Sequence, residues 1–308
     1  MTQAALYLES MEPPRVAQRY ANIITFSIPL LKGEVNIVDL LLIEGVKAFY
    51  PKLYNSIKEK SSYFLGTILD QGADFEQIKK LIIDLIDQSI SDLSQESQIC
   101  AKNLLKELFP RLTGILGTIH HGQDWQKTWT EEKRIASSRY FQRYFAYSIA
   151  EDDISDQSLI KFLNQLNTAS VSNIILEIKK LTNEQNSSID SFLAEMFRKL
   201  DKLSSSASHN LALALAQMGD YFPKPETLYS FDTVFTKAGI LVSSLITRLD
   251  TSDEKLELCR EVLQAAKPVS FATECFRWIR ATQKDNQQED KEDLFSESVR
   301  SHFFSSLP

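Results

Sequence analysis

The amino-acid sequence predicts an all-α fold, and three observations carry this prediction. Apolar residues recur at helical spacing along most of the 308 residues. No stretch alternates with a period of two for long enough to indicate a β-strand. Glycine and proline, with nine residues each, are scarce for a chain of this length, which favours long helices over many turns. We therefore expect roughly a dozen helices.

The N-terminal part shows two clear helical stripes. Apolar residues from Val38 to Phe49 fall on one helix face, and Asn36 is the expected N-cap of that helix. A second stripe runs from Phe75 to Leu93. Within it, residues 81–84 (LIID) have the letters of a Walker B strand. Because the helical spacing continues through this segment, we interpret it as helix.

The C-terminal part repeats the pattern. Stripes run over Ile189–Leu200 and Val234–Leu249, with short polar loops between them. Thr251 followed by Glu254 forms the sequence of a capping box and predicts the start of the next helix. Ser270 is the predicted cap of a further helix. This order of elements predicts an array of helix hairpins, although no fixed-period repeat is present.

A glycine-rich stretch divides the chain. Residues 113–126 hold three of the nine glycines and the His120-His121 pair, and we expect a loop or short hairpin there. We place a lid-like helical unit at residues 1–120 and the helical array, as a region for interaction, at residues 121–308. The acidic residues 151–156 are expected to form the turn that opens the helix from Gln157.

Composition limits the possible partners and location. With a net charge of −7 and a pI of about 5.3, the chain has no general attraction to nucleic acid or anionic membranes. No signal peptide and no run of ~18 apolar residues is found, so we expect a cytoplasmic protein without a membrane segment. Cys100, Cys259 and Cys275 are far apart, which favours three reduced, buried thiols.

The sequence offers no catalytic or metal-binding constellation. No glycine is followed by lysine, so the Walker A motif, whose backbone and lysine hold phosphates, is absent. His120 and His121 are adjacent, and His209 and His302 are isolated, which does not match metal-ligand spacing. We therefore predict no catalytic residue and no metal site in this chain.

Residues 139–147 (RYFQRYFAY) combine aromatic side chains with Arg139 and Arg143. Aromatic and arginine side chains together can form a stacking platform for nucleic-acid bases. Three of the aromatic residues share one helical face, however, which favours core packing with the two arginines on the outer side. These three residues are Phe141, Tyr144 and Phe145.

Three matches along the chain carry a resemblance to a known family, and the first of them extends over residues 13–54. Residues 13–22 read PPRVAQRYAN, and residues 28–41 and 49–54 read IPLLKGEVNIVDLL and FYPKLY. Residues 133–145 read KRIASSRYFQRYF, and a more generic match joins residues 245–249 to 270–272. In this order, the segments resemble the region that follows the nucleotide-binding core in KAP-family P-loop NTPases. The first two matches are the more specific ones.

The resemblance implies a role in nucleotide-dependent work, in some relatives in antiphage defence. The catalytic half of such proteins precedes this region, so this chain alone is expected neither to bind nor to hydrolyse ATP. ATP and Mg would enter only with the missing NTPase half. The resemblance also implies that Arg15, one helical turn from Arg19, senses the γ-phosphate.

Two alternatives remain open at this point. Arg15 and Arg19 could instead pair with surface carboxylates such as Glu12. The whole chain could be a free-standing helical scaffold that binds a protein partner without any nucleotide. If the NTPase half is the natural partner, the apolar faces at Ile23-Ile24 and residues 40–43 are expected to be left exposed and to promote self-association.

Overall fold

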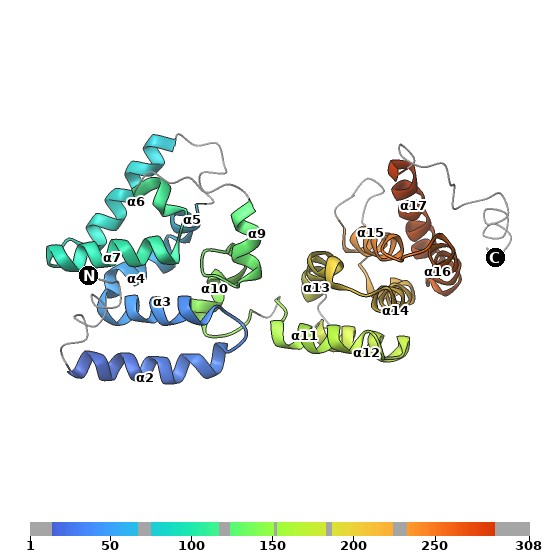
Figure 1. Cartoon of the computed structure of the whole chain (residues 1–308), viewed down its shortest axis with the longest axis horizontal. Helices are drawn as coiled ribbons and strands as arrows, with labels where there is room; N and C mark the ends of the chain where they lie inside the picture. The colour runs from blue at the N-terminus through green and yellow to red at the C-terminus, as the bar shows by residue number, and fades with distance from the viewer. Residues whose placement is uncertain are drawn as a thin grey trace. The chain divides into compact units, whose positions relative to one another are not determined.

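The computed structural model describes residues 14–66, 75–116, 124–150, 153–182, 187–223 and 233–286. All regular secondary structure in these ranges is helical, so the all-α prediction is confirmed (Figure 1). The chain forms two compact units, residues 1–149 and 150–308. None of the described helices has both the length and the apolar composition needed to cross a bilayer.

The helices of the first unit are α2 (Pro14–Leu31), α3 (Ile37–Phe49), α4 (Pro51–Glu59), α5 (Ser61–Leu65), α6 (Phe75–Ile90), α7 (Gln95–Leu108), α8 (Leu112–Leu116), α9 (Asp124–Glu131) and α10 (Ser138–Ala146). Helix α3 contacts α2, α4 and α7, and α4 also contacts α6 (Figure 1). The fully buried side chains of α3 include Leu40, Ile43 and Val46. The side chain of Asn36 accepts the backbone N–H groups of Val38 and Asp39, so the predicted N-cap is confirmed.

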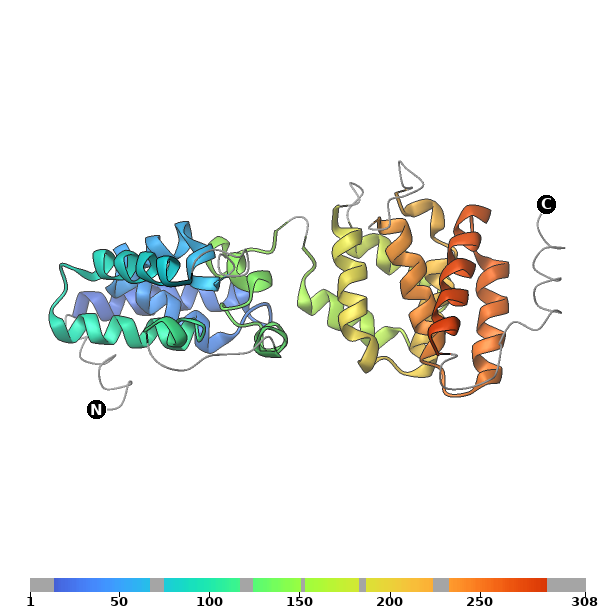
Figure 2. The same ribbon diagram turned by 90° about the horizontal axis from the view of Figure 1, so that it is seen from above.

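The second unit holds α11 (Asp156–Gln165), α12 (Val171–Leu181), α13 (Ser187–Lys199), α14 (Ser205–Ala216), α15 (Val234–Thr247), α16 (Ser252–Ala265) and α17 (Val269–Asn286). Two 3₁₀ turns, η2 (Leu200–Lys202) and η3 (Gly219–Tyr221), flank α14. Contacts are most extensive between α14 and α15 and between α15 and α17, which lie side by side in Figure 2. Helix α14 also contacts α12 and α16.

The boundary between the units lies later than the predicted division after residue 120. Helices α9 and α10 belong to the first unit, because Trp129, Ile135 and Phe141 are buried in its core. The predicted loop at residues 113–126 is partly helical, since α8 extends to Leu116 and α9 begins at Asp124. Its central glycines and histidines, including His120 and His121, lie outside the described residues.

Local sequence signals identified some of the helix starts. The capping box at Thr251 and Glu254 is present with both of its hydrogen bonds. Residues 81–84 lie within α6, which agrees with the helical interpretation of the Walker B letters. The cap predicted at Ser270 is wrong, because α17 already begins at Val269 and Ser270 lies in its first turn. All three cysteines are buried thiols, as predicted.

Candidate functional site

Helix α2 presents a stripe of exposed side chains that is basic at its N-terminal end and apolar at its C-terminal end. The members, which we call the α2 stripe, follow one another at helical spacing and are Arg15, Arg19, Asn22, Phe26 and Leu30. Phe26 is 63% exposed and Leu30 is 49% exposed. The helix contains no acidic residue. Both arginines are open to solvent, as expected, and form no ion pair with a described residue. Glu12, the alternative partner, lies outside the described residues.

The first turn of α3 also exposes apolar side chains. Ile37 and Val38 are 42% and 58% exposed. The apolar face predicted at residues 40–43 is not the exposed one. Leu40 and Ile43 are fully buried, because α3 turns these residues toward the core of the unit.

Residues 28–41 and 133–145, which belong to the two more specific matches, meet in the first unit. The backbone N–H of Asn36 donates to the carbonyl oxygen of Lys133 at 3.1 Å and to the hydroxyl of Tyr144 at 3.0 Å. Tyr144 in turn donates to the same Lys133 carbonyl at 2.7 Å. The ammonium of Lys133 donates to the carbonyl of Gly33 at 2.5 Å. The turn between α2 and α3 is therefore fixed to the segment before α10.

The second link between the segments is formed by the buried carboxylate of Asp39. Asp39 accepts from the Nε–H of Arg134 at 2.8 Å and from the backbone N–H of Ile135 at 2.9 Å. Arg134 also donates to the carbonyl of Glu107 on α7. Burial raises the pKa of Asp39 above its ordinary value, and the arginine and the backbone N–H oppose this shift. Asp39 thus ties α3 to the segment before α10, and Arg134 ties that segment to the end of α7.

The third link is an ion pair between Glu34 and Arg143. Arg143 donates to the Glu34 carboxylate at 3.0 Å and to its backbone carbonyl at 3.2 Å, and both residues are buried. The guanidinium also lies 4.9 Å from the ring centre of Tyr140. Phe141, Tyr144 and Phe145 are core residues as the helical spacing indicated. The prediction that both arginines lie on the outer side is wrong for Arg143, because Glu34 provides a buried counter-charge.

The fourth link joins α3 to the end of α10. The hydroxyl of Tyr147 donates to Glu44 at 2.6 Å and accepts from the ammonium of Lys47 at 2.5 Å. Tyr147 has a left-handed backbone with a φ of 54°, a conformation that non-glycine residues adopt only at a cost. Burial raises the pKa of Glu44, whereas Tyr147 and Lys47 favour its charged form. Burial also raises the pKa of the nearby Tyr54, to about 12.

Replacing Tyr147 by phenylalanine is expected to make the stability of the first unit more dependent on pH. Glu44 has a folded-state pKa above its unfolded value, so stability decreases as pH rises from the unfolded toward the folded pKa. Without the hydroxyl, the buried carboxylate loses its donor, which should cost about 1–3 kcal/mol at pH 7 and less near pH 4. Urea unfolding across this pH range measures the effect. Glu44→Gln is the matched control: in its background Tyr147→Phe should no longer change the pH dependence of stability, because the carboxyl that titrates beside Tyr147 is gone.

Other candidate groups do not converge on a reaction centre. Among the described residues, no group of three or more histidine, cysteine or carboxylate side chains is placed to hold a metal. His209 lies 3.0 Å from Glu261, joining α14 to α16. His302 lies outside the described residues. The four links join segments of the first unit to one another, whereas the α2 stripe is exposed, so the stripe is the candidate functional surface.

Sequence reasoning found the arginines of the stripe but missed the buried network. Asp39 and Glu44 interrupt the most apolar window of the chain, but the stripe from Val38 to Phe49 leaves both off its apolar face, so the stripe did not predict their burial. Comparison of the chain with known protein families, curated proteins and solved structures found no match.

Proposed function

We propose that this chain is the non-catalytic helical part of a KAP-type P-loop NTPase assembly and that it couples the nucleotide state to interaction with a partner. The observation that carries the proposal is the α2 stripe, which sets two exposed arginines beside exposed apolar side chains. A guanidinium keeps its charge at all physiological pH values and matches phosphate oxygens with paired donors. In this proposal, Arg15 contacts the nucleotide held by the partner domain, and Phe26 and Leu30 contact the domain itself.

The way in which α2 is anchored supports a coupling role. The helix has 18 residues, so its two ends lie about 27 Å apart. Its N-terminal end carries Arg15 and Arg19, and its C-terminal end leads into the turn that Glu34 and Asn36 fix to the α10 segment. Along its length, Tyr20 donates to the carbonyl of Leu41 on α3 at 3.0 Å. A force on the arginines would therefore reach the buried network through one continuous helix.

Replacing Arg15 by alanine tests the proposal in a reconstituted system. The protein would be mixed with a P-loop domain of the KAP family produced as a separate chain, and ATP turnover and complex formation would be measured. Because arginines that contact a transferring phosphate contribute factors of about 10³ or more, we expect turnover to fall by at least about tenfold with assembly unchanged. Arg19→Ala should have a smaller effect.

Lys58→Ala is the matched control, since Lys58 is an exposed cation on α4 that forms no ion pair with a described residue. Equal turnover with Arg15→Ala and Lys58→Ala would contradict a nucleotide contact. In that case Phe26 and Leu30 would favour the alternative function, a helical scaffold that binds a protein partner without nucleotide. Complex formation that is lost in Phe26→Ser and is the same with and without ATP would support this scaffold, whereas a complex that forms only with ATP would support the nucleotide contact.

A further inference from the structure

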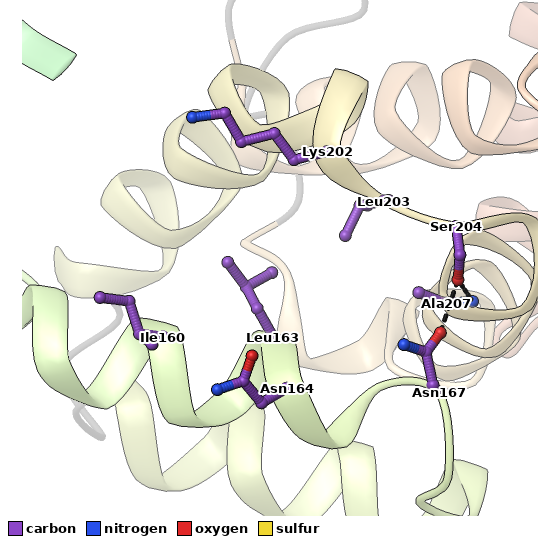
Figure 3. A pocket seen from close by; sticks show the side chains of 8 residues that line it. All are labelled: Ile160, Leu163, Asn164, Asn167, Lys202, Leu203, Ser204 and Ala207. Atoms are coloured by element: carbon purple, nitrogen blue, oxygen red, sulfur yellow. Dashed lines mark hydrogen bonds between the residues drawn. The ribbon is translucent and has the colours of Figure 1, made fainter.

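The second unit contains a pocket of about 340 Å³ between α11, η2 and the start of α14 (Figure 3). This volume lies within the range of small-molecule sites, which combine apolar walls with a few polar groups. The apolar lining consists of Ile160, Leu163, Leu203 and Ala207, and the polar lining consists of Asn164, Asn167, Lys202 and Ser204. Leu163 and Leu203 point toward each other across the space between the two segments (Figure 3).

Lys202 gives this pocket a positive charge. It is the one charged side chain among the eight that line the pocket. Its neighbour Asp201 does not neutralise it, because Asp201 pairs with Arg248 at 2.9 Å. Lys202 itself forms no ion pair with a described residue. In Figure 3 its side chain runs along the η2 side of the pocket, across from Leu163, and its ammonium lies at the end away from Asn167 and Ser204. An anionic group in the pocket would therefore meet a cation that the fold has not already paired.

The two asparagines add hydrogen-bond donors. In Figure 3, Asn164 lies beside Leu163 on α11, and Asn167 lies beside Ser204. The side-chain oxygen of Asn167 accepts from Ser204 at 2.5 Å, which orients its NH₂ group away from that bond. Asn164 forms no hydrogen bond with another described residue. Ser204 is already used, because its hydroxyl also accepts the backbone N–H of Ala207. The free donors of the lining are thus the Lys202 ammonium and the two carboxamide groups.

We propose that this pocket binds a carboxylate that carries an apolar group. A carboxylate in the pocket would accept a charge-assisted hydrogen bond from the Lys202 ammonium, and the carboxamide NH₂ groups provide further donors along the lining. Leu163, Leu203 and Ile160 provide the contact for the apolar group; Ile160 is 52% exposed and so gains most from being covered. A free small acid and the C-terminal residue of a peptide share this chemistry. The proposal concerns the second unit alone and does not depend on the function proposed for the α2 stripe.

Nuclear magnetic resonance with ¹⁵N-asparagine labelling of the full chain tests this site. The three probes are N-acetyl-leucine, an acetylated Gly-Ser pentapeptide that ends in leucine with a free carboxylate, and the same peptide with a C-terminal carboxamide. Saturable shifts of the Asn164 and Asn167 side-chain signals are expected with both carboxylates and not with the carboxamide. If the pentapeptide binds at least about tenfold more tightly than N-acetyl-leucine, the ligand is a peptide terminus, and the reverse order identifies a free acid.

Two variants separate the charge from the pocket shape. Lys202→Met should weaken carboxylate binding by about tenfold or more, because a hydrogen bond from a charged donor is lost. Lys161→Met is the matched control, since Lys161 is an exposed lysine on α11 that does not line the pocket, and it should bind as the unchanged protein does. Equal binding of carboxylate and carboxamide, equal effects of the two lysine variants, or no saturable shift at millimolar probe would each overturn the proposal.

Discussion

Replacing Arg143 by methionine is expected to lower the free energy of unfolding of the first unit by about 3–5 kcal/mol, because the buried Glu34 carboxylate loses its counter-charge. Both side chains are almost completely buried, at 2% and 5% exposure. The ion pair also holds the α2–α3 turn through the Glu34 backbone carbonyl. The loss should therefore exceed that of a typical surface ion pair, which contributes at most about 1 kcal/mol.

Urea denaturation followed by tryptophan fluorescence can measure this effect in the first unit. A Trp278→Phe background leaves Trp125 and Trp129, which both lie in α9 of that unit, as the reporters. The double variant Glu34→Leu with Arg143→Met is the informative control, since it removes both charges and should recover much of the lost stability. A loss below about 1 kcal/mol in the single variant would show that solvent reaches the pair.

Replacing Gly219 by alanine is expected to destabilise the second unit by at least about 3 kcal/mol, at the upper end of overpacking effects. A Cβ atom at this position would lie 2.4 Å from the carbonyl oxygen of Lys267 and 2.5 Å from the Cβ of Phe271. Neither atom is at the end of a flexible side chain, so relief requires the start of α17 to move away from η3. The buried contact between the rings of Phe222 and Phe271, 5.3 Å apart, would be disturbed with it.

Gly239→Ala is the matched comparison in the same unit. Its Cβ would lie 3.1 Å from the Cγ of Glu274 and 3.3 Å from the Cδ1 of Trp278, which are side-chain atoms that can shift. The helix propensity of alanine, better than that of glycine by about 1 kcal/mol, offsets part of this crowding. Thermal unfolding followed by circular dichroism should show a large shift for Gly219→Ala and a small one for Gly239→Ala. Similar shifts for both variants would contradict the close approach at Gly219.

The local features of this protein could be predicted from the sequence because they depend on residues close together in the chain. The Asn36 cap and the Thr251–Glu254 capping box each involve groups within three positions. The amphipathic stripes identified the helices for the same reason. Ser270 shows the limit of such signals, since a residue suited to capping does not act as a cap where the helix starts one position earlier.

The candidate surface could be predicted only in part. The exposure of Arg15 and Arg19 agrees with the sequence expectation, because they are charged side chains at helical spacing. The exposed apolar side chains that follow the arginines along α2, Phe26 and Leu30, were not predicted. An apolar stripe shows which face of a helix is apolar, but it does not show how much of that face the other helices cover. Phe26 and Leu30 are exposed although Leu31, beside them in sequence, is buried.

By itself, the sequence determined the helical fold, the helix starts at Asn36 and Thr251 and the burial of the three cysteines. Only the tertiary structure decided that Arg143 lies inside, because its partner Glu34 is 109 positions away and supplies the counter-charge that burial requires. The same holds for the boundary at residue 149 and for the pocket beside Lys202. Helical periodicity acts over a few residues, whereas the free energy of burying a charge depends on groups that only the folded chain brings together.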